Sequence, residues 1–248
     1  MKFLLFGILQ GLTEFLPVSS SGHLYLLKRI IGEQANLFAF FILLHAATLA
    51  ATIIFFFKQI ISLCAKKRLL LQIAVITAVT GTMGLAIKHF FEPWFDKKIL
   101  LSGCILTNAL ILFSARPTND SPKKTAETMT VKDSLLIGLM QGISAFPGIS
   151  RSGSTITAFL RRGFAPQEAF TLSFVASIPV ILAAFILEIK ELPNLTVHTG
   201  TKGIIAGCLA AAATGLLALI VLKRLVVNAR FKNFSYYCFT LFIISLFL

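Results

Sequence analysis

The chain has 248 residues, of which 56% are hydrophobic and only 13% are charged, and its mean hydropathy is +0.86. Soluble domains carry about twice this share of charged residues, so the composition excludes an ordinary soluble domain and indicates a membrane protein. The chain has 23 Lys and Arg against 10 Asp and Glu, a net charge of +13. These basic residues lie in short gaps between apolar runs, where they orient helices and meet anionic headgroups, so we expect no nucleic-acid partner.

The first apolar segment, residues 3–27, is interrupted by Gly, Pro and Ser and by the carboxylate of Glu14. An interrupted segment suits a re-entrant helix–loop–helix buried in protein better than a helix facing lipid. Glu14 and Pro17 within the run, and no A-x-A site after it, argue against a cleaved signal peptide. Three segments long enough to cross a bilayer then follow, at residues 37–57, 69–87 and 99–115.

The same order recurs in the second half of the chain. Residues 134–160 form another interrupted segment, followed by apolar segments at residues 169–189, 203–222 and 234–248. The last is short and needs Tyr236 and Tyr237 as anchors at the membrane interface. The sequence therefore predicts an all-α membrane protein, a single membrane domain over residues 1–248, with six transmembrane helices and two re-entrant segments. None of the four cysteines is spaced from another as metal ligands or redox pairs are, so we interpret them as small hydrophobic residues. They are Cys64, Cys104, Cys208 and Cys238.

The distribution of Lys and Arg predicts the orientation. If six segments cross and two return, fourteen basic residues collect on one side, eight on the other, and Arg151 stays within the membrane, which accounts for all 23. The side with fourteen is expected to be cytoplasmic. Residues 116–133 then form a cytoplasmic linker, and both termini face outward.

The two interrupted segments resemble each other. Residues 7–11 recur as residues 138–142, and residues 19–22 align with residues 150–153, at a constant offset of 131. Because three spans follow each copy, the second copy is inverted in the membrane relative to the first. We therefore expect two inverted repeats, residues 1–115 and 134–248, whose broken segments meet near the midplane, where binding sites form.

The first motif carries an ionisable residue and a run of hydroxyls. Glu14 at membrane depth costs a few kcal/mol unless it is paired, so it is a cation ligand, a proton carrier or the partner of a buried Arg. After Pro17, the backbone of Ser19–Gly22 suits a helix start that binds an anion. His23 could be a general acid, a general base or a nucleophile. The plainer alternative is that the serines cap a helix and His23 lies at an interface.

The second motif surrounds Arg151 with hydrogen-bond donors, from Gly148 to Thr155. Arginine binds phosphate bidentately and keeps its charge, so Arg151 suits a diphosphate clamp. The alternative role is an ion pair with Glu14 that holds the repeats together. Other ionisable residues are weaker candidates. His45, near Thr48, could face the site, but a role in helix packing is favoured. The remaining ones are His89 and His198 at span ends, and Asp96, Asp120, Glu127 and Asp133 as solvated loop charges.

Residues 10–23 (QGLTEFLPVSSSGH) and 147–153 (PGISRSG) resemble the two signature motifs of the undecaprenyl-diphosphate phosphatase family, also called bacitracin-resistance proteins. The resemblance covers essentially the whole chain. It implies hydrolysis of undecaprenyl diphosphate to the monophosphate at the outer face of the bacterial cytoplasmic (inner) membrane. That reaction recycles the lipid carrier for peptidoglycan and gives tolerance to bacitracin. The implied partners are a polyprenyl diphosphate and the bilayer, with a second copy of the chain as a further candidate.

The motifs and the resemblance together assign candidate roles. The expected catalytic residues are Glu14, Ser20, His23 and Arg151, with the nucleophile left open between Ser20, His23 and a water. Hydrogen-bond donors and small residues expected at the substrate are Ser19, Ser21, Gly22, Gly148, Ser150, Ser152, Gly153 and Thr155. The resemblance implies a divalent cation, Mg²⁺ or Ca²⁺, at Gln10 and Glu14. Many members have Glu where this chain has Gln10, which leaves less charge for the cation. A transporter or flippase of a prenyl-phosphate lipid is the alternative function, because inverted repeats with broken helices are also a transporter design.

Overall fold

The computed structural model describes residues 1–33, 37–95, 97–115, 124–190, 201–228 and 230–247. Within these ranges the chain forms eleven α-helices, with short 3₁₀ turns between some of them. The helices of the first half are α1 (Lys2–Phe15), α2 (Ser20–Ile30), α3 (Phe38–Phe55), α4 (Phe57–Cys64), α5 (Lys67–Phe91) and α6 (Lys98–Phe113). Those of the second half are α7 (Val131–Gly142), α8 (Arg151–Arg161), α9 (Pro166–Glu188), α10 (Thr201–Val227) and α11 (Phe234–Phe247).

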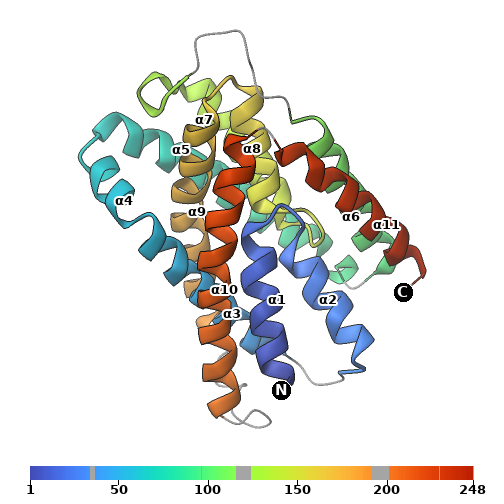
Figure 1. Ribbon diagram of the computed structural model, residues 1–248. Coiled ribbons are helices and arrows are strands. Elements are labelled where there is room, and N and C mark those ends of the chain that lie inside the picture. Colours follow the sequence, from blue (N-terminus) through green and yellow to red (C-terminus); the bar gives the residue numbers. More distant parts are fainter. Residues whose placement is uncertain (34–36, 96, 116–123, 191–200, 229, 248) are drawn as a thin grey trace.

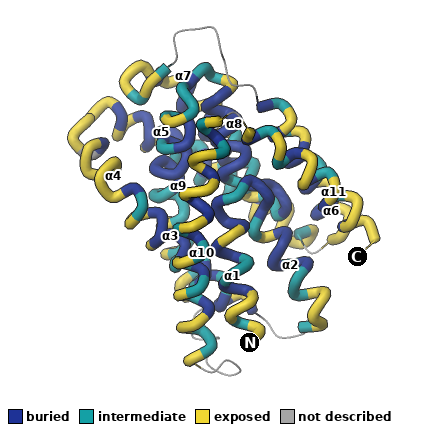
Figure 2. Tube along the Cα trace, in the orientation of Figure 1, coloured by how far each residue is buried: buried dark blue, intermediate teal, exposed yellow. Residues whose placement is uncertain are grey.

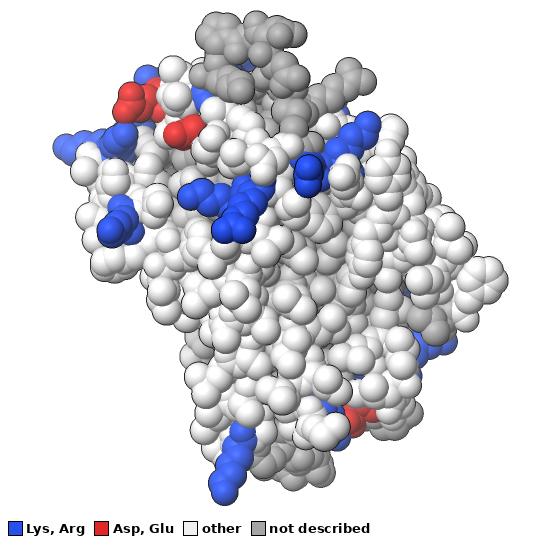
Figure 3. Space-filling model, viewed as in Figure 1, with Lys and Arg blue, Asp and Glu red and all other residues white. Residues whose placement is uncertain are grey.

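Four stretches are long and apolar enough to cross a membrane: Phe38–Phe55, Lys67–Trp94, Pro166–Glu188 and Thr201–Val227. They correspond to four of the six predicted spans. The other two predicted spans form the shorter α6 and α11, of 16 and 14 residues, which pack against each other. Figure 3 shows Lys and Arg in two zones separated by a broad band without charged residues. The chain is thus an all-helical, multi-pass membrane protein.

Two boundaries differ from the sequence prediction. The helix predicted at residues 37–57 ends at Phe55, and the chain turns at Phe56 into α4, a separate short helix. Helix α7 begins at Val131, three residues before the predicted start of the second repeat at residue 134. The reason is a capping box at Thr130, whose hydroxyl accepts a bond from the backbone N–H of Asp133 at 3.2 Å.

The prediction that Asp133 is a solvated loop charge is wrong. Its side chain is completely buried and bonds Lys124 at 3.0 Å and Arg162 at 2.6 Å. Thr130 also donates to it, at 2.7 Å from the hydroxyl and 3.0 Å from the backbone. Glu127 does behave as expected, in an exposed pair with Lys66. Asp96, Asp120 and His198, the other weak candidates, lie outside the described residues.

The two interrupted segments each form two short helices joined by a tight turn. At a rise of 1.5 Å per residue, α1 is about 21 Å long, and α2, α7 and α8 are about 16–18 Å long, all short of the ~30 Å hydrocarbon core of a bilayer. In Figure 1 the α1–α2 pair enters from the lower end of the molecule and the α7–α8 pair from the upper end. Their turns meet in the interior, where the backbone N–H of Gly148 lies 3.4 Å from the hydroxyl of Ser21.

Glycines on the first helix of each pair allow close helix packing. Helix α1 packs on α10, and Gly7 lies so close to the backbone of Gly207 that a side chain could not fit. Helix α7 packs on α5 in the same manner, where a Cβ on Gly138 would lie 2.8 Å from a side-chain carbon of α5. Threonines donate across both contacts, Thr214 to α1 at 3.4 Å and Thr80 to α7 at 3.1 Å. The two halves thus use matching residues in matching contacts.

The largest hydrophobic cluster lies between the helices and contains stacked aromatic rings, among them Phe56, Phe170 and Phe174. Figure 2 shows buried residues along the inward faces of the helices and exposed residues on the outer faces of α4, α5 and α11. Many exposed side chains are large and apolar, such as Leu71 and Leu209. An apolar exterior around a partly polar interior is the pattern expected of a protein surrounded by lipid.

Candidate active site

The site is built around the carboxylate of Glu14, on the last turn of α1. Gln10 lies one turn earlier on the same face, and its amide nitrogen donates to Glu14 Oε2 at 3.0 Å. Ser20, at the start of α2, donates its hydroxyl to the same oxygen at 2.6 Å. The other oxygen, Oε1, pairs with the guanidinium of Arg151. Because the Glu14 side chain is only 5% exposed, these partners are what make a charge acceptable at this depth.

Arg151 reaches Glu14 because it is the first residue of α8. The helix starts there because Ser150 is its N-cap and accepts a bond from the backbone N–H of Gly153 at 3.1 Å. Gly153 must be small, since a Cβ there would lie 3.1 Å from Pro17 of the other motif. The ion pair therefore joins the two repeats. For both residues, this ion pair was predicted as the alternative to a direct role in binding a cation or the diphosphate.

The turn before α2 is strained in a way that positions Ser20. Ser19 has φ +69°, in the left-handed region that residues other than glycine seldom adopt, and it caps α2 by accepting from Gly22 at 3.3 Å. Gly148, in the opposing turn, has φ +101° and passes close to the backbone of α6. These conformations bring the two turns into contact and leave the Ser20 hydroxyl directed at Glu14.

His23 lies in the same helix, but both of its ring nitrogens are engaged elsewhere. Nδ1 lies 2.7 Å from the carbonyl of Ser19, which can only accept, so Nδ1 carries the proton. Nε2 of the neutral ring then accepts from the hydroxyl of Tyr237 at 2.6 Å. Tyr237, predicted as an interface anchor, is exposed and its ring also lies parallel to that of His23. His23 therefore presents no free lone pair in this arrangement.

Asn108 of α6 connects the two motifs and was missed by the sequence analysis. Its side-chain nitrogen donates to the carbonyl of Pro17 at 3.1 Å, and its side-chain oxygen accepts from the backbone N–H of Ser150 at 3.0 Å. Asn108 is fully buried. The available signal was an amide alone in an apolar span, since such residues are rare there unless they bond to a specific partner.

The remaining candidates line the motifs in different ways. Ser150 and Ser152 lie 3.1 Å apart through their hydroxyls. Thr155 is completely buried and donates to the carbonyl of Arg151 at 2.7 Å. Gly22 packs at van der Waals distance from Gly148. All of these residues lie within the two touching turns or the first turns of α2 and α8.

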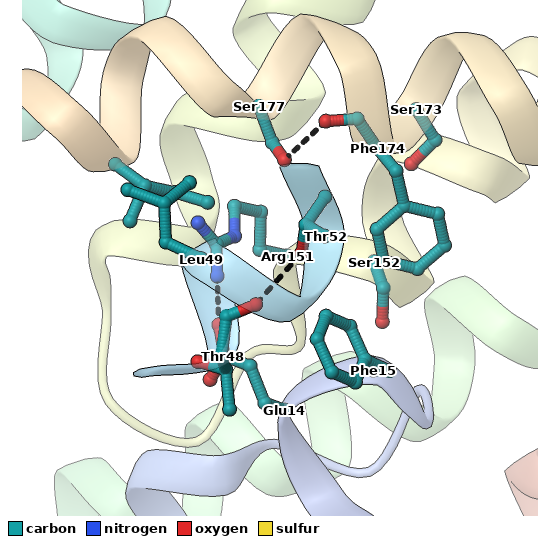
Figure 4. Close-up of a pocket in the computed structure, with 11 residues that line it drawn as sticks. Glu14, Phe15, Thr48, Leu49, Thr52, Arg151, Ser152, Ser173, Phe174 and Ser177 are labelled. Atoms are coloured by element: carbon teal, nitrogen blue, oxygen red, sulfur yellow. Dashed lines mark hydrogen bonds and ion pairs between the residues drawn. The ribbon is translucent and has the colours of Figure 1, made fainter. Parts of the chain in front are cut away.

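A small pocket, part of it open to solvent, lies beside the Glu14–Arg151 pair, between α3 and α9 (Figure 4). Its walls combine aromatic rings, Phe15 and Phe174, with hydroxyl groups. These hydroxyls come from α3, α8 and α9 and belong to Thr48, Thr52, Ser152, Ser173 and Ser177. Small polar groups around a paired charge in an otherwise apolar wall are typical of a ligand site.

His45 of α3 also reaches Glu14, which was the less favoured of the two roles predicted for it. Its Nε2 lies 3.5 Å from Glu14 Oε2, so it is not only a helix-packing residue. A cation could be held by Glu14 together with Gln10, whose buried side-chain oxygen has no hydrogen-bond partner among the described residues. Over the same residues, no three His, Cys, Asp or Glu side chains come together. Any cation must therefore also use neutral oxygens or substrate oxygens.

Comparison with known proteins identifies the family of the chain. Residues 3–244 match the family model described as "Bacitracin resistance protein BacA". A protein of Treponema denticola named undecaprenyl-diphosphatase is 38% identical over 250 residues, covering 94% of this chain and 91% of that protein. Proteins of the same name from Thermosipho africanus and Methanosphaera stadtmanae are 38% and 32% identical, each over 100% of this chain and 99% and 97% of their own lengths. The chain belongs to the bacitracin resistance protein BacA family.

Proposed function

We propose that this chain is an integral membrane phosphatase that hydrolyses undecaprenyl diphosphate to undecaprenyl phosphate and inorganic phosphate. The relatives named undecaprenyl-diphosphatase cover 94% and 100% of the chain. The observation that carries the proposal is the carboxylate of Glu14, bonded at once to the guanidinium of Arg151 and the hydroxyl of Ser20. This triad combines an anion-binding group, a nucleophile and a base. Through this reaction the protein returns the lipid carrier to peptidoglycan synthesis and gives resistance to bacitracin.

Arg151 binds the diphosphate in this mechanism. When the substrate enters, the guanidinium exchanges Glu14 for phosphate oxygens, which it can bind through two N–H groups at once. The start of α8 adds backbone N–H groups and the hydroxyls of Ser150 and Ser152. These fixed donors stabilise the charge that develops on the equatorial oxygens during transfer.

Ser20 is the nucleophile and Glu14 its base. The hydroxyl already donates to Glu14 Oε2 at 2.6 Å, so the proton passes to the carboxylate as Ser20 Oγ attacks the terminal phosphorus. A bond from Oγ to phosphorus forms, the bridging P–O bond breaks, and undecaprenyl phosphate leaves. Glu14 then releases the proton that it took from Ser20. The free carboxylate deprotonates a water, and this water cleaves the phosphoserine. His23 is the weaker nucleophile because Ser19 and Tyr237 occupy both of its nitrogens.

A divalent cation, Mg²⁺ or Ca²⁺, fits next to the carboxylate. Glu14 Oε2 and the unpartnered oxygen of Gln10 are the oxygen ligands that such ions prefer. When bound, the ion neutralises part of the negative charge of the diphosphate. Glu14 and Gln10 would hold such an ion through their side-chain oxygens, while Glu14 Oε1 pairs with Arg151.

The proposed architecture has six crossing helices and two re-entrant pairs in inverted repeats, in the bacterial inner membrane. It is supported by the short α1–α2 and α7–α8 pairs and by the matched glycine contacts of α1 on α10 and α7 on α5. The active site then opens to the outer face, the side from which α1 enters. This orientation is the one favoured by the excess of Lys and Arg on the opposite side.

The test is phosphate release from undecaprenyl diphosphate by purified full-length protein, with and without EDTA. Glu14→Ala and Arg151→Ala are expected to abolish release, and EDTA to suppress it until Mg²⁺ or Ca²⁺ is restored. His89→Ala, in an exposed residue near the end of α5, is the matched control and is expected to keep full activity. No release from folded wild-type protein at any cation concentration would contradict the proposal and leave lipid transport as the activity to examine.

A further inference from the structure

His45 takes part in the site in a way that the mechanism above does not use. It lies in the middle of α3, with Nε2 of its imidazole 3.5 Å from Glu14 Oε2. Its side chain is 37% exposed, against 5% for Glu14. It is thus the partner of Glu14 with the most open access, and it comes from a helix outside both motifs.

The hydrogen bonds fix which nitrogen of His45 faces Glu14 with a lone pair. Nδ1 lies 2.8 Å from the backbone carbonyl of Phe41, which can only accept a hydrogen bond, so Nδ1 carries a proton. In the neutral imidazole, Nε2 then carries a lone pair. That lone pair lies 3.5 Å from Glu14 Oε2, which is itself an acceptor. Two acceptors cannot bond each other directly, so either a proton on Nε2 or a cation between the two atoms must join them.

Gln10 adds a third acceptor to the same side of the carboxylate. Its amide nitrogen donates to Glu14 Oε2 at 3.0 Å, while its buried oxygen has no partner among the residues that the structure describes. A half-turn of the amide exchanges the two atoms and brings the oxygen to face Glu14 Oε2. An acceptor at that position is stable only if a cation binds both oxygens. The same amide therefore donates to Glu14 in the structure and could turn its unpartnered oxygen toward a cation.

We propose that His45 is a ligand of the divalent cation in this chain, binding through Nε2 together with Glu14 and Gln10. This inference rests on the proposed function, because the cation is the one that hydrolysis uses. The contact of Nδ1 with the Phe41 carbonyl is the orienting bond that metal-binding histidines usually make through their second nitrogen. With one carboxylate and one neutral amide, the site has a single negative charge, and the imidazole supplies the third donor.

A nitrogen ligand changes which metal the site prefers. Ca²⁺ binds through six to eight oxygens, whereas imidazole favours first-row transition ions. The wild-type protein is therefore expected to bind Mn²⁺ more tightly than Ca²⁺. Loss of His45 is expected to weaken Mn²⁺ binding by about tenfold or more and to weaken Ca²⁺ binding much less.

Electron spin echo spectroscopy of the Mn²⁺-loaded, detergent-solubilised full chain tests this directly, because it detects nitrogen bound to the metal. The wild type is expected to show the modulation of a coordinated ¹⁴N nucleus, and protein grown with ¹⁵N-histidine is expected to replace that signal. The isotope experiment needs no substitution, so it stands even if a variant does not fold. Mn²⁺ and Ca²⁺ affinities are measured on the same samples.

Three variants assign the signal. His45→Ala is expected to abolish it, whereas His89→Ala and His23→Ala are expected to keep it, since the nitrogens of His23 are bonded to Ser19 and Tyr237. Bound Mn²⁺ without a histidine signal, or a signal lost in His23→Ala and kept in His45→Ala, would overturn the proposal. Phosphate release without a histidine signal would support the phosphatase function and contradict the proposal that His45 binds the cation. A histidine signal without phosphate release would support His45 as a cation ligand and contradict the phosphatase function.

Discussion

Replacing Asp133 by Asn tests the contribution of one buried charge at the start of α7, outside the membrane-spanning helices. The carboxylate is completely buried and accepts from Lys124, Arg162 and Thr130. Asn keeps the shape and removes the charge. The substitution therefore measures the charge at nearly constant packing.

The pKa of Asp133 gives the magnitude. Burial raises this pKa, but hydrogen bonds from Thr130, Arg162 and Lys124 outweigh burial and lower it from 3.8 to about 2. At about 1.4 kcal/mol per pKa unit, and allowing for screening of two cations that are each about a third exposed, the charge stabilises the fold by about 2 kcal/mol. Since the folded pKa lies below the unfolded one, this stabilisation is complete above about pH 5, roughly half remains near pH 3, and it is lost as the pH falls through about 2.

The assay is reversible unfolding in mixed micelles, with wild type and Asp133→Asn compared from neutral to acid pH. The variant is expected to be less stable by about 2 kcal/mol at pH 7, and the difference is expected to close as the wild-type carboxylate becomes protonated. Glu127→Gln removes an exposed carboxylate that pairs with Lys66 nearby, and it is expected to change nothing measurable. Equal stability at pH 7, or a difference that persists unchanged in acid, would refute the reasoning.

Three further predictions concern the site and its supports. Ser20→Ala is expected to reduce kcat for phosphate release on the order of 10³-fold or more, and His23→Ala clearly less; equal losses would point to His23 as a direct participant. Asn108→Leu leaves the buried N–H of Ser150 without a partner, at about 1–3 kcal/mol, and leaves the Pro17 carbonyl only the weak thiol donor of Cys238, so it is expected to lower both the melting temperature and kcat, and an unchanged melting temperature would contradict the bonds described. Gly138→Ala forces a Cβ to within 2.8 Å of α5 and is expected to destabilise the fold, whereas Gly81→Ala, with no atom within 4 Å, is expected to match or exceed wild-type stability in the same thermal scan.

The sequence predicted those parts of the molecule that depend on local pattern. The breaks at Pro17 and Gly148 are visible because Pro ends a helix and Gly permits the left-handed backbone that the second turn requires. The approach of Glu14 to Arg151 followed from two ionisable residues in membrane segments, since each needs a partner there. Most helix positions followed from apolar length alone.

The parts that the sequence did not predict depend on contacts between distant residues. Asn108 bonds Pro17 and Ser150, 91 and 42 residues away, and no spacing rule indicates such partners. Asp133 was assigned to solvent because it follows a polar linker, but Lys124 and Arg162 cover it in three dimensions. The contact of His45 with Glu14 likewise depends on how α3 packs beside α1, which helical periodicity does not determine.

The pairing of Glu14 with Arg151 also has an electrical consequence for the energised membrane in which we place the protein. A lone elementary charge at this depth would feel the transmembrane potential, worth about 2.3 kcal/mol per 100 mV for a full crossing. The two opposite charges of the empty site cancel, so the potential exerts almost no net force on them. The conformation of the substrate-free protein is therefore expected to be independent of the membrane potential. The potential can act on the site only when a charged lipid or a cation has entered.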